Sequence, residues 1–178
     1  ALLAEHGLVD KRFTAVDAIH VSDDEVKSLG NARAAVCVCP ISEQNLGLAV
    51  APAERLLAAG AGLALGSDTN TQIDLLAEAR LLEYRLRGAG RPRAGIAADA
   101  ATALFHAASV SGARCLGATG GALEVGRPAD FFTVNLFDPS IAGADPGSLL
   151  ANIVFALERR ALREQLRDAR LEREPALR

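Results

Sequence analysis

Two side chains that could activate a water molecule, those of His20 and Asp68, each follow a short apolar run. His20 ends the run FTAVDAIH at residues 13–20, and Asp68 follows LALGS at residues 63–67. Hydrolysis by a metal-activated water needs an imidazole and a carboxylate that converge from different strands. Taken singly, a histidine of this kind is typical of a core or cap, and such an aspartate of a helix N-cap. The pair therefore indicates a catalytic centre only where the fold brings the two runs together.

The apolar runs that carry these residues are predicted to be strands of a parallel sheet. The expected strands cover 13–21, 34–39 and 63–66, and the helices between and after them cover 22–29, 52–59 and 74–87. Continuous short apolar strands that alternate with helices are typical of a parallel sheet covered on both faces. The pattern fits an open doubly wound sheet and also part of a (β/α)₈ barrel. Since ligands bind at the carboxyl ends of such strands, the residues that follow them are the candidate site.

Local signals predict further elements. Ser22 and Glu25 form a capping box, which predicts that a helix starts after Ser22. Glu78, Arg80 and Glu83 predict a salt-bridged helix surface, with an ion pair between Arg80 and Glu83. The other expectations are an irregular segment at 41–50, a helical pair at 97–116 broken near 109–112, a hairpin or strand pair within 120–139, and a charged helix in the tail from 148 to 178.

Composition excludes several classes of function. The 178 residues carry a net charge of −3, so a general nucleic-acid-binding face is not expected. No apolar run is long enough to span a bilayer, so a membrane partner is not expected either. Three cysteines, Cys37, Cys39 and Cys115, do not suggest a disulfide framework, and this predicts a reducing, cytoplasmic setting. Because the chain lacks Met and begins inside a helical pattern, we expect it to be a piece of a longer protein.

Three strings resemble the amidohydrolase superfamily, in the order in which that family has them. IHVSDDEV resembles its sixth barrel strand, GLALGSDT its eighth strand, and GGALEVGRPADFFTVNL a strand that returns to a small β-sandwich. The resemblance implies an α/β fold: the C-terminal portion of a (β/α)₈ TIM-like barrel, strands six to eight, plus part of a small β-sandwich. It implies two domain parts, with residues 1–117 in the barrel and residues 118–178 as partial sandwich strands and a charged tail.

The resemblance also implies a cofactor and a reaction. The family binds zinc (Zn²⁺), with other divalent metals as alternatives, and the position of Asp68 implies a zinc ligand that accepts a proton from the attacking water. The position of His20 implies a residue that orients this water. CPISEQNLG and AEARLLEYRLR resemble the formimidoylglutamate deiminase group. This group hydrolyses N-formimino-L-glutamate to N-formyl-L-glutamate and ammonia, in histidine degradation.

Other interpretations remain open. A purine deaminase such as a guanine deaminase, or a triazine-type deaminase or chlorohydrolase, would belong to the same superfamily. Ser42, Glu43 and Asn45 are candidate substrate-binding residues, although polar residues after a strand are commonly only solvated. The expected partner is a small-molecule substrate, and the complete protein is expected to be a homo-oligomer.

The sequence departs from the family pattern in its metal ligands. It has no His-x-His pair, and Asp17 stands where the group often has a histidine. Catalytic zinc sites use three protein ligands, so we expect the isolated chain to be inactive. A non-catalytic relic or interaction domain is the alternative from another class, since an incomplete barrel exposes unpaired strand edges that a partner would have to cover.

Overall fold

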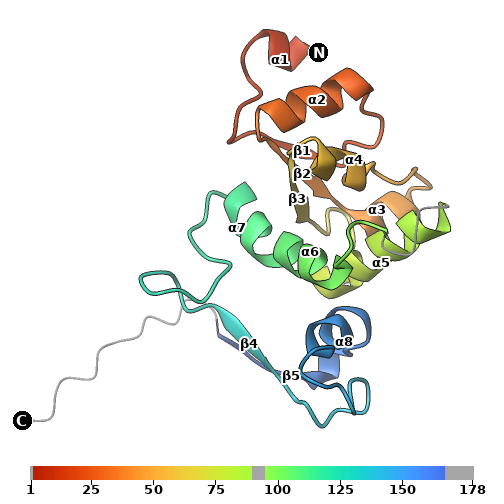
Figure 1. The fold of residues 1–178 in the computed structure, drawn as a ribbon, viewed down its shortest axis with the longest axis vertical. Helices are drawn as coiled ribbons and strands as arrows, with labels where there is room; N and C mark the ends of the chain where they lie inside the picture. Colours follow the sequence, from red (N-terminus) through yellow and green to blue (C-terminus); the bar gives the residue numbers. More distant parts are fainter. Residues whose placement is uncertain (1, 90–94, 167–178) are drawn as a thin grey trace, which may run out of the picture.

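The computed structural model describes residues 2–89 and 95–166, as an α/β arrangement with two separate sheets (Figure 1). Its elements, in chain order, are α1 (Leu2–Glu5), β1 (Thr14–Val16), α2 (Asp23–Asn31), β2 (Ala35–Val38), α3 (Pro40–Asn45), α4 (Ala53–Ala58), β3 (Gly62–Leu65), α5 (Leu75–Gly88), α6 (Ala100–His106), the π-helical segment η1 (Ala107–Ser111), α7 (Gly112–Cys115), β4 (Phe131–Val134), α8 (Leu149–Phe155), the 3₁₀ turn η2 (Arg159–Ala161) and β5 (Leu162–Leu166).

The larger sheet is parallel, in the order β1-β2-β3, as the alternation of apolar runs and helices predicts. Val36 and Val38 of β2 lie level with Leu63 and Leu65 of β3, and all four side chains are buried in the main core. Side chains alternate between the two faces of a strand, so Cys37 lies on the opposite face, which carries smaller residues. The core is therefore asymmetric, with its bulky aliphatic side chains on one face of the sheet.

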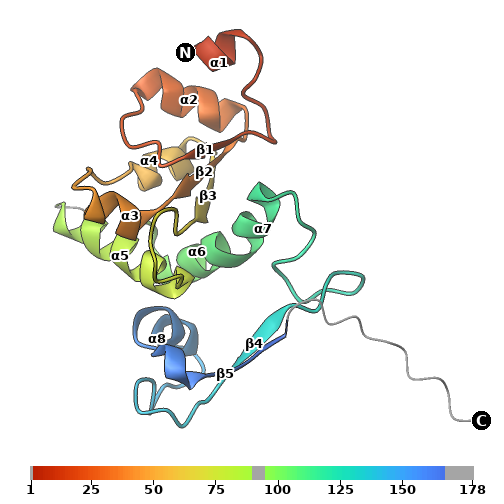
Figure 2. The same ribbon diagram turned by 180° about the vertical axis from the view of Figure 1, so that it is seen from behind.

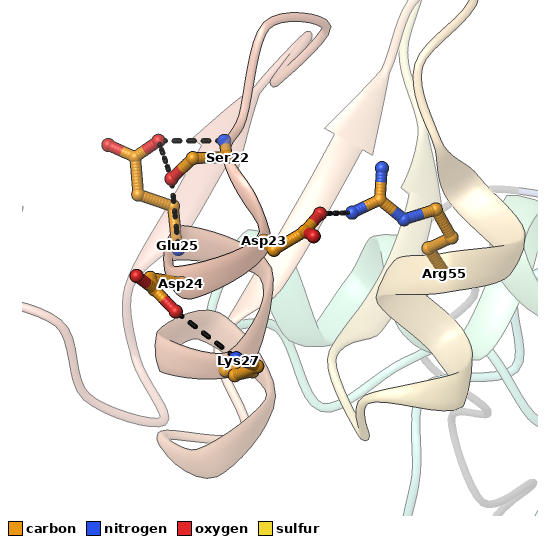
Figure 3. A network of polar contacts seen from close by, with 6 residues as sticks. All are labelled: Ser22, Asp23, Asp24, Glu25, Lys27 and Arg55. Carbon is orange, nitrogen blue, oxygen red and sulfur yellow. Dashed lines mark hydrogen bonds and ion pairs between the residues drawn. The ribbon is translucent and has the colours of Figure 1, made fainter.

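Helix α2 begins where the capping box predicts. The Ser22 hydroxyl accepts the backbone N–H of Glu25, while the Glu25 carboxylate accepts the backbone N–H of Ser22 at 2.9 Å (Figure 3). Two N–H groups that the helix cannot satisfy internally are satisfied in this way. An ion pair between Arg55 of α4 and Asp23 of α2 joins the two helices (Figure 3). The prediction of α2 from its local signal is confirmed.

Helix α8 joins the parallel sheet region to the smaller sheet. It packs against α5 and α6, and Val154 is fully buried in the main core (Figure 2). Arg80 of α5 donates hydrogen bonds to the carbonyl oxygens of Val154 at 2.5 Å and Leu157 at 2.6 Å. Val154 lies in the last turn of α8, where carbonyls lack partners within the helix, and Leu157 lies just beyond the end. A guanidinium there accounts for both carbonyls, and its positive charge interacts favourably with the helix dipole.

The smaller sheet is antiparallel and pairs β4 with β5, at the end of the molecule far from α1 (Figure 1). The prediction of a charged helix in the tail is wrong for residues 162–166, which form β5; a helix does form at α8, but it contains no charged residue. The prediction of a hairpin within 120–139 is also wrong. Only β4 forms there, and its partner strand lies about thirty residues further along the chain. Long-range pairing has overridden the local helix propensity of the tail. The tail prediction for residues 167–178 lies outside the described residues.

Two further local predictions are wrong. Residues 41–45, part of the segment expected to be irregular, form α3 together with Pro40, which occupies the first helical position, where proline is favoured. The break expected near residues 109–112 is instead the segment η1, through which the helix continues from α6 into α7. Within the described residues, no helix has the length and apolar character that crossing a bilayer requires.

Candidate active site

The segments that follow β1, β2 and β3 are bound to one another at the carboxyl edge of the parallel sheet. The backbone N–H of Asp17, directly after β1, donates to the carbonyl oxygen of Cys37 in β2 at 2.8 Å. The hydroxyl of Ser42, in α3, donates to the carbonyl oxygen of Ser67, after β3, at 2.8 Å. Loops that meet at this edge form the binding sites of parallel α/β proteins. This edge is therefore the candidate site.

Asp68 lies in a loop that hydrogen bonds fix on both sides of it. The Ser42 hydroxyl lies 3.1 Å from the Thr69 hydroxyl, and the backbone N–H of Asn70 donates to the Ser67 carbonyl oxygen at 2.7 Å. Asp68 has a φ of 41°, in the left-handed region that a residue with a Cβ adopts at a cost. The surrounding bonds hold the backbone there, and Asp68 itself is exposed. The loop thus presents a carboxylate at the open edge of the sheet.

Glu78 of α5 also forms hydrogen bonds that hold the Asp68 loop. It is fully buried, and its carboxylate accepts the backbone N–H of Ile41 at 2.8 Å and the side-chain amide of Asn70 at 3.1 Å. Burial raises the pKa of Glu78, and the hydrogen bonds from Ile41 and Asn70 oppose that rise. One buried carboxylate therefore ties the start of α3 and the Asp68 loop to α5.

Glu43 has a similar structural environment. It is 1% exposed, and its carboxylate accepts the backbone N–H of Cys39 at 2.9 Å. An ion pair of 3.4 Å joins it to Arg85, which also donates to the Leu48 carbonyl oxygen at 2.6 Å. Burial raises the pKa of Glu43, while the Cys39 hydrogen bond and the Arg85 charge lower it. The Glu43 carboxylate is thus engaged by the N-cap residue of α3 and by Arg85 of α5, which in turn holds the segment after α3.

The residues predicted for the site are placed differently from one another. Ser42 is buried and contacts the Asp68 loop, whereas Asn45, the last residue of α3, is exposed. His20 is exposed too, in the turn between β1 and α2. Among the described residues, no side-chain hydrogen bond ties His20 or Asn45 to the Asp68 loop. The structure therefore brings Ser42 and Asp68 together at the edge, and the roles of His20, Glu43 and Asn45 toward a substrate stay predictions.

Asp17, which the sequence indicates only as a departure from the family pattern, is a further candidate for the site. It directly follows β1, with a φ of 62°, and the next residue, Ala18, also has a positive φ of 48°. Its Oδ1 atom is buried and has no hydrogen-bond partner among the described residues. A buried carboxylate oxygen without a partner is costly and needs an explanation. The signal in the sequence was its place at the end of a strand, three residues before the more conspicuous His20.

The prediction of a salt-bridged surface on α5 is wrong. Glu78 and Glu83 are fully buried, and Arg80 contacts the end of α8 instead of Glu83. Glu83 pairs with Arg87 and accepts the backbone N–H of Ile96 at 3.0 Å. Both glutamates fall on the face of the helix that the leucines define at 75, 82 and 86, because positions three and four apart lie together. The spacing of the leucines along the helix thus already indicates that both glutamates lie on its buried face.

The described residues do not by themselves fit a catalytic zinc ion. Within residues 2–89 and 95–166, no group of three or more histidine, cysteine, aspartate or glutamate side chains is arranged to hold a metal. A catalytic zinc site uses three protein ligands and keeps one position open. Asp68 offers one carboxylate of suitable chemistry, and the described part of the chain does not complete the set.

Comparison with known proteins places these features in a family. The model of the amidohydrolase family matches residues 2–164. Formimidoylglutamate deiminase of Pseudomonas aeruginosa is 35% identical over 166 residues, which cover 91% of this chain and 37% of that protein. A 5-methylthioadenosine/S-adenosylhomocysteine deaminase of Moorella thermoacetica is 32% identical over 161 residues, 88% of this chain and 36% of that protein.

Solved structures agree in fold. The crystal structure of an adenosine deaminase from Xanthomonas campestris with bound zinc superposes with a TM-score of 0.81 at 27% identity, covering 93% of this chain and 38% of that one. The chain thus spans a little over a third of the length of the relatives it matches. The match over residues 2–164 confirms the resemblance that the strand motifs indicated, and the chain belongs to the amidohydrolase family.

Proposed function

We propose that this chain is part of a metal-dependent deaminase and that the complete enzyme hydrolyses N-formimino-L-glutamate to N-formyl-L-glutamate and ammonia. One observation carries the proposal: the loop after β3 holds Asp68 at the carboxyl edge of the sheet through the buried contacts of Ser42 and Glu78. The similarity to the P. aeruginosa formimidoylglutamate deiminase supports this choice of substrate.

The proposal includes the architecture that the family resemblance implies. Strands β1, β2 and β3 would be strands six to eight of a (β/α)₈ barrel, and β4 with β5 would belong to a small β-sandwich. The boundary would lie near residue 117. The parallel order β1-β2-β3 and the separate antiparallel pair support this assignment.

Asp68 would have two roles in the reaction. It would be one ligand of the divalent metal, preferably zinc, and its carboxylate would accept a proton from the attacking water. The water oxygen adds to the formimino carbon and the nitrogen leaves as ammonia, so that C=NH and H₂O become C=O and NH₃. His20 would orient the water. Among the candidate substrate-binding residues, Asn45 is exposed and free to approach a substrate, whereas Ser42 and Glu43 would act from buried positions.

A purine-type substrate is the second candidate. The M. thermoacetica relative acts on methylthioadenosine and S-adenosylhomocysteine by its name, and the X. campestris structure is an adenosine deaminase. These proteins are similar to the chain at 32% and 27% identity, against 35% for the formimidoylglutamate deiminase. Triazine-type substrates remain an alternative in the same family.

The test is ammonia release by the protein encoded by this reading frame together with the coding sequence immediately upstream of the Ala1 codon. N-formimino-L-glutamate, methylthioadenosine and guanine would be offered as substrates. We expect release from N-formimino-L-glutamate, and Asp68→Asn should lower kcat by about 10²-fold or more, the usual contribution of a positioned proton acceptor. Asp24→Asn, which removes an exposed carboxylate on α2, is the matched control and should leave kcat unchanged.

Release from methylthioadenosine or guanine instead would move the proposal to the purine candidate. A protein that binds no metal and releases ammonia from none of the three substrates would favour the non-catalytic relic. Asp68→Asn with full activity would contradict the role of Asp68 itself.

A further inference from the structure

Cys37 and Cys39 bring two sulfur atoms together on the small-residue face of the parallel sheet. Because they lie two residues apart along an extended chain, their side chains point to the same face. A Cβ built at Gly66 would lie 2.9 Å from Cys37 Sγ and 3.1 Å from Cys39 Sγ, so both sulfurs lie against this one glycine. Each thiol also shifts the pKa of the other, which agrees with their closeness. Both sulfurs therefore lie beside the same glycine in the folded chain.

The two thiols differ in accessibility and in acidity. Cys37 is partly exposed, whereas Cys39 is 2% exposed. The hydrogen bond from Cys39 lowers the pKa of Cys37, against the effects of burial and of the nearby charges of Asp17 and Asp68, and the same bond raises the pKa of Cys39. The thiolate is the reactive form of cysteine. Cys37 is thus the more accessible and the more acidic of the two thiols, and Cys39 is placed to react with it in a second step.

We propose that Cys37 and Cys39 form an oxidisable dithiol, which a peroxide converts to an intramolecular disulfide. In the first step Cys37 attacks the peroxide: with hydrogen peroxide its sulfur gains one oxygen, as a sulfenic acid, and one water leaves. In the second step the Cys39 sulfur attacks this sulfenic acid, the S–S bond forms and a second water leaves. Two thiols and one H₂O₂ give one disulfide and two H₂O, with the peroxide as the two-electron oxidant.

The geometry makes this disulfide reversible. Cys39 directly follows β2, and two residues of extended chain separate the Cα atoms of Cys37 and Cys39 by about 6.6 Å, near the upper end of the range that a disulfide spans. Such a bond is strained and easily reduced. Closing it pulls Cys39, which is the N-cap of α3, toward β2. Since Ser42 of α3 holds the Asp68 loop, oxidation would shift that loop.

The experiment uses the full 178-residue chain and follows thiols by mass spectrometry. The reduced chain is treated with graded hydrogen peroxide, the remaining thiols are alkylated, and the chain is cut with trypsin. One tryptic peptide, residues 34–55, contains both Cys37 and Cys39, while Cys115 falls in another peptide. We expect peptide 34–55 to lose two hydrogen atoms and both alkylation sites, and to recover both sites after dithiothreitol treatment.

Two variants sharpen the result. Cys115→Ser is the matched control: Cys115 lies on α7, where burial and the nearby charge of Cys37 raise its pKa, but the proposed disulfide does not include it, so this variant should behave as the parent chain. Cys37→Ser should leave Cys39 fully alkylatable after the same peroxide treatment. Three outcomes in the parent chain would each overturn the proposal: stable higher oxidation of Cys37 without a cross-link, a dimer joined through Cys37, or oxidation of Cys115 while peptide 34–55 stays reduced.

Discussion

Three buried glutamates use their carboxylates to hold backbone N–H groups at the ends of elements. The donors are Cys39 for Glu43, Ile41 for Glu78 and Ile96 for Glu83. A buried carboxylate is tolerated where such donors compensate its loss of water. Glu43, Glu78 and Glu83 lie in the two strings that resemble the formimidoylglutamate deiminase group. Their structural role in this chain is therefore to hold the segments around the candidate site.

The first prediction concerns Glu78→Gln, which keeps the shape of the side chain. The carboxylate accepts two donors, from Ile41 and Asn70, and a glutamine offers only one oxygen. One buried donor would then face the amide NH₂ group. We expect the free energy of unfolding to fall by about 1–3 kcal/mol, the cost of leaving a buried polar group unsatisfied. Urea denaturation of the 178-residue chain measures this change in the free energy of unfolding.

Glu5→Gln is the control, because Glu5 is an exposed residue of α1 and the substitution also removes one carboxylate. It should change the unfolding free energy by less than about 0.5 kcal/mol, as surface substitutions usually do. Equal effects of the two substitutions would show that Glu78 does not hold the loop in the way the hydrogen bonds indicate.

The residues of the candidate site could be predicted only in part. Asp68 and Ser42 were found from their places after apolar runs, because the ends of parallel strands meet. The unpartnered oxygen of Asp17 and the burial of Glu78 were not foreseen. Their surroundings are set by groups distant in the sequence: Glu78 meets the N–H of Ile41, thirty-seven residues earlier. A single sequence gives the residue type and the local period, but not the donor that compensates a buried charge.

At the scale of elements, the contact between α2 and α4 depends on one glycine. A Cβ at Gly30 of α2 would lie 2.1 Å from the carbonyl oxygen of Ala59, the C-cap of α4. Within a helix, alanine is otherwise favoured over glycine by about 1 kcal/mol. Here the backbone of α4 occupies the space that the methyl group needs, so packing and propensity act in opposite directions.

The second prediction is that packing outweighs propensity at Gly30. Gly30→Ala should lower the unfolding free energy by about 1–3 kcal/mol, the usual cost of overpacking a core. Gly88→Ala is the matched control, since Gly88 is also helical and a Cβ there meets no atom of the described residues within 4 Å. We expect it to leave stability unchanged or to raise it by up to about 1 kcal/mol. Thermal unfolding of both variants measures these changes in stability. A Gly30→Ala chain that is more stable than the parent would contradict the close contact between α2 and α4.

Elements with local signals were predicted well, and those that depend on distant pairing were not. The capping box of Ser22 and Glu25 marked the start of α2, because both partners lie within one turn. Strand β5 was expected to be helical, since its charged sequence has little strand propensity. Its conformation is set by the pairing with β4, whose nearest paired residue, Val134, is separated from Leu162 by twenty-eight residues. Helix α3 was missed because Pro40 was interpreted as the end of a strand and not as the start of a helix.

At the scale of the whole molecule, the parallel sheet has two open edges. Within the described residues, β1 and β3 each pair with β2 only, so each has one side without a strand partner. Exposed strand edges favour association with further strands. The chain covers 37% of the P. aeruginosa relative, and under the barrel architecture proposed above further strands would pair at these edges. That the complete protein is a homo-oligomer stays a prediction.

The last prediction concerns metal binding by the 178 residues alone. The described part of the chain offers no group of three suitable ligands, and a single carboxylate such as Asp68 holds zinc weakly. We therefore expect equilibrium dialysis to find no stoichiometric zinc at micromolar concentrations, and Asp68→Asn to change nothing. Tightly bound zinc that is lost in the Asp68→Asn variant would contradict this expectation and show that the chain assembles its own site. Tightly bound zinc that only Cys37→Ser releases would contradict it as well, and would assign the metal to Cys37 and Cys39 at the end of β2 and not to the carboxylate after β3.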